Sequence, residues 1–166
     1  MTTLSPAKQL DTFIAKYTPQ GGLVWASTFG VTTGHVGHEY TYGLDFDAAG
    51  NLYVAGASNS SAPQFGGLNA GNNGSYDAFV TKVNGATGAF QWVRNFGGTD
   101  SDLGYDVSVS PAGDVFLSGR YEGTVDFNPD PLATYELTSA GEFDAFYLKL
   151  DTQGDFEWAT GLPITA

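Results

Sequence analysis

Cysteine is absent from this chain of 166 residues, so neither disulfide bonds nor thiol chemistry contributes to its structure or function. Positive charge is scarce, because six Lys and Arg stand against 18 Asp and Glu, giving a formal net charge of −12. This charge repels nucleic-acid phosphates and anionic membrane surfaces, and we expect no nucleic-acid partner. No run approaches the roughly 18 consecutive apolar residues of a membrane-spanning helix, so we expect no membrane insertion.

The usual sequence marks of catalysis are also missing. The chain has no Cys nucleophile, no serine in a G-x-S-x-G turn and no glycine-rich loop that opens a helix. Carboxylates are abundant enough to supply a glycosidase pair, but most of them recur in turns, which favours a structural role. We therefore expect a protein that is not an enzyme.

What the sequence does contain is repetition. DTFIAKYTPQGGLVWASTFG begins at Asp11, DAFVTKVNGATGAFQWVRNFG at Asp77, and DAFYLKLDTQGDFEWATGL at Asp144. A second block lies between these, YTYGLDFDAAGNLYVAG at Tyr40–Gly56, and it recurs as LGYDVSVSPAGDVFLSG at Leu103–Gly119. Repeats of this length with several strand-like runs per period indicate stacked β units.

Each full repeat predicts four strands, and the whole chain about ten. In each repeat the first strand alternates apolar and polar residues, and the second is a nearly continuous apolar run. The two strands meet at a tight turn, where Gly50 or Gly113 supplies a positive φ. The third strand is the run AFVTKV or its equivalents, and the fourth carries the tryptophan. The first and second strands are expected at Tyr42–Phe46 and Leu52–Gly56, and again at Tyr105–Val109 and Val115–Gly119.

Four antiparallel strands per unit, repeated, are typical of a β-propeller blade, so the predicted fold class is all-β with about two and a half blades. We predict one repeat domain over residues 1–166, with a half-blade at 11–30, one blade at 40–97 and another at 103–161. Blades pack face to face, and recurring large side chains fill the space between them. The expected inter-blade core residues are Trp25, Trp92, Trp158, Phe79 and Phe146.

The units DAFVTK…G…W…FGG and DLGYDVSVSPAGDVFLSG resemble the bacterial β-propeller repeats called SBBP repeats. The stretch GTVDFNPDPLATYELTSAGEFDAFYLKLDTQGDFEWA is similar to a variant of that repeat found in large secreted proteins, and the resemblance covers Asp11 to Trp158. It implies a propeller module, usually one of many in a long exported polypeptide, without general catalytic residues. The copy number departs from closed propellers, which usually need four to eight blades.

Two acidic stretches are candidate calcium sites, because calcium takes six to eight oxygen ligands and carboxylates on alternate residues of a tight loop can converge on one ion. The alternative is an ordinary solvated acidic turn, and no other cofactor is expected. The first set is Asp126, Asn128 and Asp130, and the second is Asp100, Asp102 and Asp106.

Other charged residues favour structural roles. Asp77 and Asp144, like Asp11, are each followed five positions later by a lysine, and repetition in every unit argues against a catalytic pair. Each Asp is expected to accept hydrogen bonds from the backbone where the chain enters a strand. His35 and His38 form, with Glu39, a weak set for a transition metal, and a plain loop is the favoured interpretation.

These observations predict a structural or assembly module. A chain of two and a half blades leaves an open apolar face at each end, and such faces require partners: copies of the same chain, as a homo-oligomer or filament, or flanking blades of a longer polypeptide. The alternative is a carbohydrate-binding module that uses Tyr and Trp near polar loops. By analogy with other Gly- and Asn-rich β repeats, we expect a mature product or a piece of an extracellular or cell-surface protein.

Overall fold

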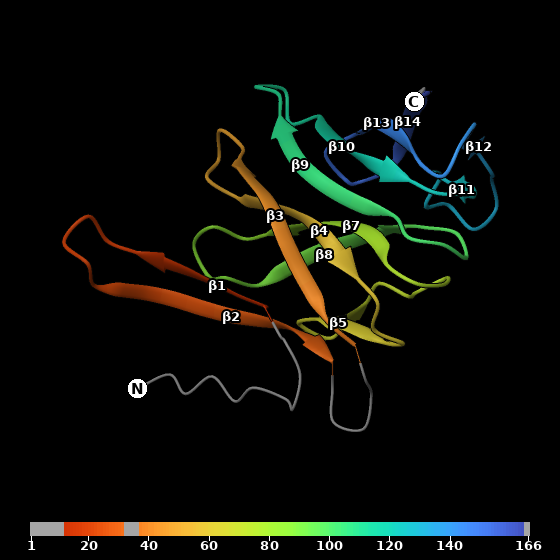
Figure 1. Ribbon diagram of the computed structural model, residues 1–166. Helices are drawn as coiled ribbons and strands as arrows, with labels where there is room; N and C mark the ends of the chain where they lie inside the picture. The colour runs from red at the N-terminus through yellow and green to blue at the C-terminus, as the bar shows by residue number, and fades with distance from the viewer. Residues whose placement is uncertain (1–11, 32–36, 165–166) are drawn as a thin grey trace.

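The computed structural model describes residues 12–31 and 37–164, and this part of the chain is all-β (Figure 1). It contains 14 strands and no helix, and no helix in it is long and apolar enough to cross a membrane. The strands are β1 (Thr12–Tyr17), β2 (Leu23–Val31), β3 (Glu39–Phe46), β4 (Leu52–Ser58), β5 (Pro63–Phe65), β6 (Leu68–Asn69), β7 (Asp77–Val83), β8 (Phe90–Phe96), β9 (Leu103–Val109), β10 (Val115–Tyr121), β11 (Thr124–Asp126), β12 (Glu136–Thr138), β13 (Asp144–Leu150) and β14 (Phe156–Leu162).

The strands form three antiparallel four-stranded sheets and one two-stranded ribbon. The first sheet has the order β1-β2-β5-β6, the middle sheet β3-β4-β7-β8, the last sheet β9-β10-β13-β14, and β11 pairs only with β12. In Figure 1 the red and orange β1–β2 hairpin projects from the body that the other two sheets form.

The predicted hairpins of the middle and last sheets are confirmed. Gly50 and Gly113 have φ values of 80° and 96°, as the turns require. The side chains of the turns support them, since Asp47 Oδ1 accepts a hydrogen bond of 2.8 Å from the Asn51 amide. Strand β3 begins three residues earlier than predicted, because a bulge between Thr41 and Gly43 interrupts the alternating pattern on which the prediction depended.

The expectation of about ten strands was too low. The four additional strands are short and lie in the two connections between a second and a third strand: β5 and β6 in one, β11 and β12 in the other. The region predicted as a half-blade over residues 11–30 is also larger than expected, because β2 pairs with β5 through Phe29 and Phe65. A connection from the following unit therefore extends the first sheet.

Two apolar clusters hold the sheets together. One lies between the first and middle sheets and includes Phe29 and Phe79; the other lies between the middle and last sheets and includes Trp92 and Phe146. Strand β4 contributes to both, because Leu52 belongs to the former cluster and Tyr53 to the latter. The middle sheet is thus covered on both faces, and each outer sheet packs against it through one.

Candidate functional site: the open faces of the outer sheets

A cluster of three phenylalanines recurs at both contacts between sheets. At the first contact the Phe29 ring stacks on Phe65 with centroids 4.9 Å apart, and the Phe79 ring lies 5.0 Å from Phe65. At the second contact the equivalent rings are Phe96, Phe127 and Phe146, with centroid distances of 6.2 Å and 4.9 Å. Each cluster takes one ring from the fourth strand of one unit and two rings from the next unit.

Sequence reasoning identified Phe79 and Phe146 but missed Phe65 and Phe127. These two rings lie in connections of unequal length and unlike sequence, so the repeat alignment does not bring them together. A signal existed: a phenylalanine follows Gly56 by nine residues in one connection and Gly119 by eight in the other.

A second recurring contact places a glycine turn on a tryptophan. A β-carbon at Gly88 would lie 2.7 Å from the Trp25 ring, and one at Gly154 would lie 3.2 Å from Trp92. The next polar residue on the fourth strand secures the turn, as when Arg94 Nε donates to the Gly154 carbonyl at 2.8 Å. Trp92 is accordingly 9% exposed.

The five predicted core residues lie in three environments. Phe79 and Phe146 are fully buried, Trp92 is nearly so, and Trp25 is half-buried against the cluster of the first contact. Trp158 lies on β14 with 41% of its surface exposed, and no described residue supplies a glycine turn over it.

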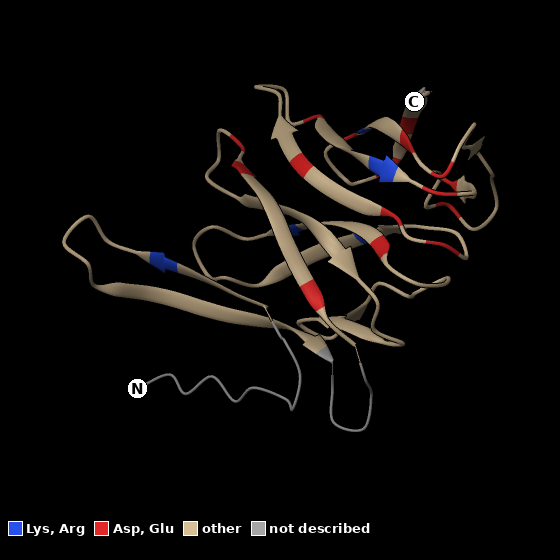
Figure 2. Cartoon of the chain, viewed as in Figure 1, with Lys and Arg blue, Asp and Glu red and all other residues tan. Residues whose placement is uncertain are grey.

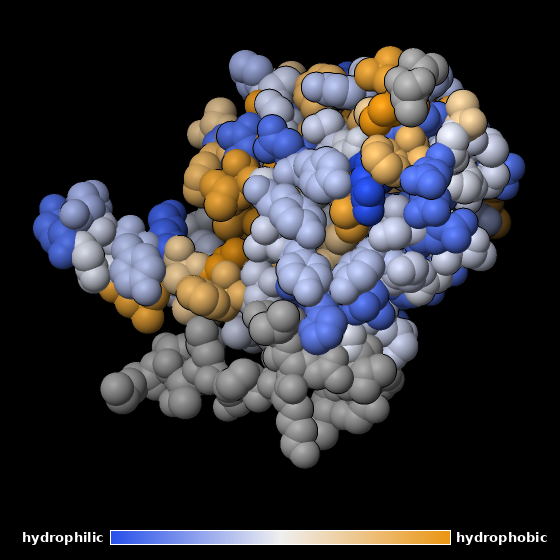
Figure 3. All heavy atoms as spheres, in the orientation of Figure 1, coloured by the Kyte–Doolittle hydropathy of each residue, from blue (hydrophilic) through white to orange (hydrophobic). Residues whose placement is uncertain are grey.

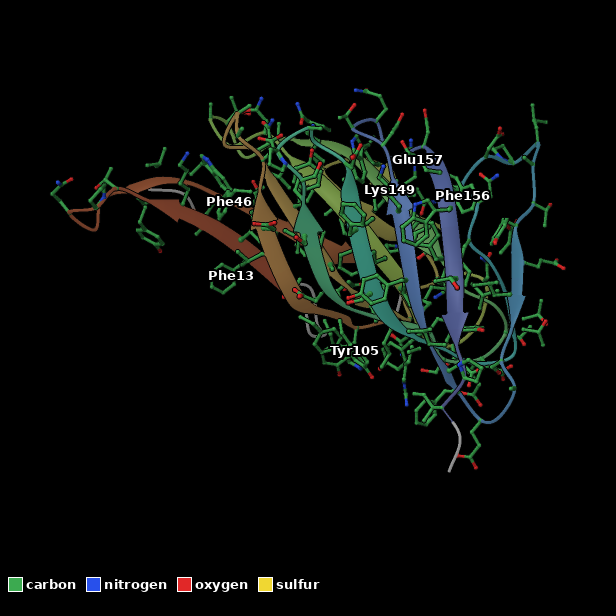
Figure 4. All side chains as sticks on the ribbon, turned by 90° about the horizontal axis from the view of Figure 1, so that it is seen from above. Phe13, Phe46, Tyr105, Lys149, Phe156 and Glu157 are labelled. Carbon is green, nitrogen blue, oxygen red and sulfur yellow. The ribbon has the colours of Figure 1, made fainter. Side chains whose placement is uncertain are left out.

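The first candidate interaction surface, which we call the hairpin surface, lies where β1 meets β3. Phe13 on β1 and Leu44 and Phe46 on β3 are more than half exposed. They border a groove of about 320 Å³ whose floor includes Leu52 and Val54. Figure 3 shows apolar atoms in orange gathered where the β1–β2 hairpin joins the body, and Figure 4 shows Phe13 and Phe46 on the two elements that border the groove.

The second candidate interaction surface, the terminal face, is the outer face of the last sheet and is more polar. Tyr147 and Trp158 are exposed there, between charged side chains. Lys149 Nζ lies 2.6 Å from Glu157 and 3.2 Å from Asp114, and Figure 4 shows the pair Lys149 and Glu157 on neighbouring strands. The hydrogen bond to Glu157, together with that to Asp114, raises the pKa of the Lys149 ammonium.

A polar groove of about 520 Å³ lies beside the last sheet, away from the hairpin surface. Arg94, Asn128, Asp130, Asp155 and Phe156 are among the residues that line it. The Arg94 guanidinium lies 3.4 Å from an Asp155 carboxylate oxygen. The groove therefore offers hydrogen-bonding groups beside one aromatic ring.

In the first predicted calcium set, the side-chain oxygens accept hydrogen bonds from the backbone. Asp126 Oδ1 accepts from the amides of Asn128 at 2.9 Å and Tyr135 at 2.8 Å. Asn128 Oδ1 accepts from the Asp130 amide at 3.0 Å, and Asp130 in turn from the Leu132 amide at 2.9 Å. Asn128 and Asp130 line the polar groove, so these two remain able to offer their other lone pairs to a ligand.

In the second set, the three carboxylates differ in environment. Asp100 is exposed, Asp102 is buried and Asp106 lies on β9, against Gly43 of β3. Among residues 12–31 and 37–164, no three His, Cys, Asp or Glu side chains form a group that could hold a metal ion. His35 lies outside the described residues, whereas the His38 ring lies 6.3 Å from that of Tyr40.

Buried carboxylates support the connections between units. Asp102 accepts hydrogen bonds from the amides of Gly98 at 2.8 Å and Glu122 at 2.9 Å. Burial raises the pKa of Asp102 to about 6. Asp77 and Asp144 accept from the amides of Asn73 and Ala140, each four residues earlier, as the repeat predicted, and burial also raises the pKa of Asp77. Asp11 lies outside the described residues.

Comparison with models of protein families and with curated proteins gives no match to this sequence.

Proposed function

We propose that this chain is a non-catalytic structural module whose sheets are β-propeller-type blades of the kind that SBBP repeats form, and that it assembles through its open faces. The observation that carries the proposal is the contrast between the closed and open faces. The chain twice builds the same contact between sheets from three phenylalanines and a glycine turn on a tryptophan. On the outer sheets, Phe13 and Trp158 occupy the motif positions of the buried Phe79 and Trp92, but they are exposed.

The partner in this proposal is either another copy of the chain or the flanking blades of a longer polypeptide. The two open surfaces differ, one being apolar and the other carrying ion pairs, so association between copies is head-to-tail. Head-to-tail contacts produce a ring when the rotation closes and a filament when it does not. By resemblance to exported repeat proteins, we place this assembly outside the cell or on its surface.

Light scattering coupled to size exclusion at micromolar concentration tests the proposal. The parent should form species larger than the 17.5 kDa monomer. Leu44→Asp places a charge on the hairpin surface, and Trp158→Asp places one on the terminal face. Each variant alone should be monomeric, whereas an equimolar mixture should form a dimer and nothing larger, because only one intact pair of surfaces remains. Leu132→Asp, at a strongly exposed position in the β11–β12 connection, is the matched control and should assemble like the parent.

A monodisperse monomer without dye-accessible apolar surface would overturn the proposal. Assembly that survives in both single variants would also exclude these two faces as the contact.

A carbohydrate-binding module is the second candidate, favoured by the polar groove. Its Phe156 ring can face a sugar, while Arg94 and Asp130 can donate and accept hydrogen bonds to hydroxyl groups. A glycan screen of the parent and of Phe156→Ala tests this function. Binding that disappears in the variant while its circular dichroism spectrum matches that of the parent would support a sugar site.

A further inference from the structure

Strand β1 has the sequence of a third strand but only one neighbour in its sheet. Its equivalents each have two: β7 pairs with β4 and β8, and β13 pairs with β10 and β14. Among the described residues, β1 pairs with β2 alone. Within residues 12–31 and 37–164, the edge that is filled by a second strand in the other two sheets is therefore open in the first.

The open edge leaves a large apolar side chain without the cover that its equivalents have. Phe13 is 62% exposed, whereas Phe79 and Phe146, at the same position of the motif, are 0% and 1% exposed. In the middle and last sheets these rings have two kinds of cover. Other rings of the phenylalanine clusters pack on them, and each ring also lies on a glycine of the second strand, because a β-carbon at Gly56 would lie 2.7 Å from Phe79 and one at Gly119 2.7 Å from Phe146.

The other side of the hairpin surface shows the same deficit. Leu44 on β3 occupies the position of Val107 on β9. Val107 is 3% exposed, within the cluster that the β4 residues Tyr53 and Ala55 share, whereas Leu44 is 61% exposed. One hairpin lying between β1 and β3 would cover both Phe13 and Leu44, and the groove of about 320 Å³ lies at that place.

Charge does not protect this edge. Natural edge strands are commonly blocked by Lys or other charged side chains. Lys16 is the sole charged residue of segment 12–31, as Figure 2 shows for the β1–β2 hairpin. Its ammonium donates to the Gly85 carbonyl at 2.7 Å, a contact with the middle unit.

We propose that the hairpin surface binds an antiparallel β-hairpin of the first-and-second-strand type, supplied by a flanking blade, whose second strand pairs with β1. The inference rests on the proposed function in the form in which flanking blades are the partner, because the β3–β4 hairpin of another copy is already covered on both faces. The partner is a two-stranded segment with an apolar second strand, a tight Gly turn and a glycine opposite Phe13.

The hairpin β3–β4 of this chain is the best template for the partner. Its face toward the last sheet carries Gly43, Tyr53 and Ala55. This face already packs against β9 where the middle and last sheets meet. Gly43 permits close approach, because a β-carbon there would lie 2.8 Å from the Asp106 backbone. An incoming hairpin with this sequence would present the same face to β3.

The test adds a synthetic peptide of residues 39–58, EYTYGLDFDAAGNLYVAGAS, to the full chain and follows amide hydrogen exchange. At saturation, exchange of the β1 amides should slow at least tenfold, while exchange in β7, which already has two neighbours, should not change. A peptide with Asp at the positions of Tyr53 and Ala55 is the control and should leave β1 unprotected.

Variants of the protein test whether the peptide binds at the hairpin surface. Phe13→Asp should abolish the protection of β1, whereas Leu132→Asp, far from β1, should retain it. Because Phe13 is exposed, the variant is expected to fold, and an unchanged melting temperature checks this.

Two results would overturn the inference: β1 amides as protected in the free chain as those of β7, or protection that persists in Phe13→Asp. The proposed function fails separately. A chain that stays monomeric in light scattering but binds the peptide refutes self-assembly and supports the hairpin site. Self-assembly with no protection of β1 by the peptide refutes the hairpin site alone.

Discussion

The middle and last sheets are built from the same four strand motifs, yet their tryptophans have different surroundings. Trp92 is covered by the Gly154 turn of the next unit and is 9% exposed, while Trp158 has no following unit among the described residues and is 41% exposed. The lysine beside each tryptophan differs as well. Lys82 Nζ lies 3.6 Å from Asp47 with its side chain largely buried, whereas Lys149 pairs with the more exposed Glu157. The comparison shows that position in the stack, rather than the motif, decides whether a residue is core or surface.

The largest effect should come from the two phenylalanines at the same motif position. Phe79→Ala removes a fully buried ring from the cluster with Phe29 and Phe65, and we expect a loss of about 4 kcal/mol in the free energy of unfolding. Phe13→Ala should cost less than about 0.5 kcal/mol, since its ring is exposed. Urea denaturation of both variants in the monomeric Trp158→Asp background measures the difference, and equal losses would show that β1 is covered within the monomer.

The tryptophans give the next largest contrast. Trp92→Ala should lower the free energy of unfolding by about 3 kcal/mol. Trp158→Ala should lower it by about 1 kcal/mol or less, because the residue is 41% exposed and its ring lies beside that of Phe116 with centroids 6.5 Å apart. Thermal melts of both tryptophan variants, each made in the monomeric Leu44→Asp background, measure this difference. If Trp92→Ala melts like the parent, the ring is no part of the core, and a ligand platform becomes the better interpretation.

The buried carboxyl group of Asp102, at the junction of the middle and last sheets, should make the stability of the fold depend on pH. The pKa of Asp102 is raised from 3.8 to about 6, so the folded protein binds this proton more tightly than the unfolded chain. Stability from this group is fully present below pH 3.8 and is lost as pH rises through 6, an effect of up to about 3 kcal/mol.

Asp102→Asn removes this titration. The parent's stability relative to the variant should therefore fall between pH 4 and pH 7, as measured by urea denaturation at several pH values. Asp100→Asn, which removes one exposed negative charge beside it, is the control and should show little of this trend. A difference between parent and Asp102→Asn that stays constant with pH contradicts the assignment.

Two glycine turns with nearly the same backbone conformation allow the cost of backbone strain to be measured separately from the cost of a side-chain clash. Gly154 has φ of 79° and lies under Trp92, whereas Gly50 has φ of 80° with nothing within 4 Å of its β-carbon position. Gly50→Ala should cost about 1 kcal/mol from the left-handed backbone alone. Gly154→Ala should cost roughly 1 kcal/mol more, because its methyl group meets the ring. Calorimetry that finds no difference would remove Gly154 from the contact.

Calcium is expected to have the smallest effect. If Asn128 and Asp130 offer their remaining lone pairs to a calcium ion with Asp126, millimolar calcium should raise the melting temperature, and Asp126→Asn with Asp130→Asn should abolish the rise. The gain is small because Asp126 Oδ1 already accepts two backbone amides. Superimposable melts with calcium and with a chelator would leave an ordinary acidic turn.

Local patterns were enough to predict the hairpins of the middle and last sheets. Alternating side chains and a glycine turn specify β3–β4 and β9–β10 within some twenty residues each, and little else in the chain competes with them. Strand β5 could not be predicted in this way, because its three residues pair with β2, more than thirty positions earlier, and otherwise only with the two-residue strand β6.

The candidate sites show the same limit. The repeat correctly indicated that Phe79 is buried, but nothing in the motif around Phe13 or Trp158 distinguishes them from their buried equivalents. Their exposure depends on which strand or turn lies next to them, and that is a property of neighbouring units. For Asp102 and Asp126, the sequence cannot separate a carboxylate that caps backbone amides from one that holds an ion, since both tasks use the same oxygens.

The composition of the phenylalanine clusters also sets the order of events on the ribosome. Phe29 packs against Phe79, which is synthesised fifty residues later, and Phe96 belongs to the same cluster as Phe146, which again follows it by fifty residues. At translation speeds of 5–20 residues per second, each fourth strand emerges roughly 3–10 s before the third-strand phenylalanine that completes its cluster. A nascent chain therefore always carries one uncovered apolar face at its growing end, and each newly made unit buries the face of the one before it.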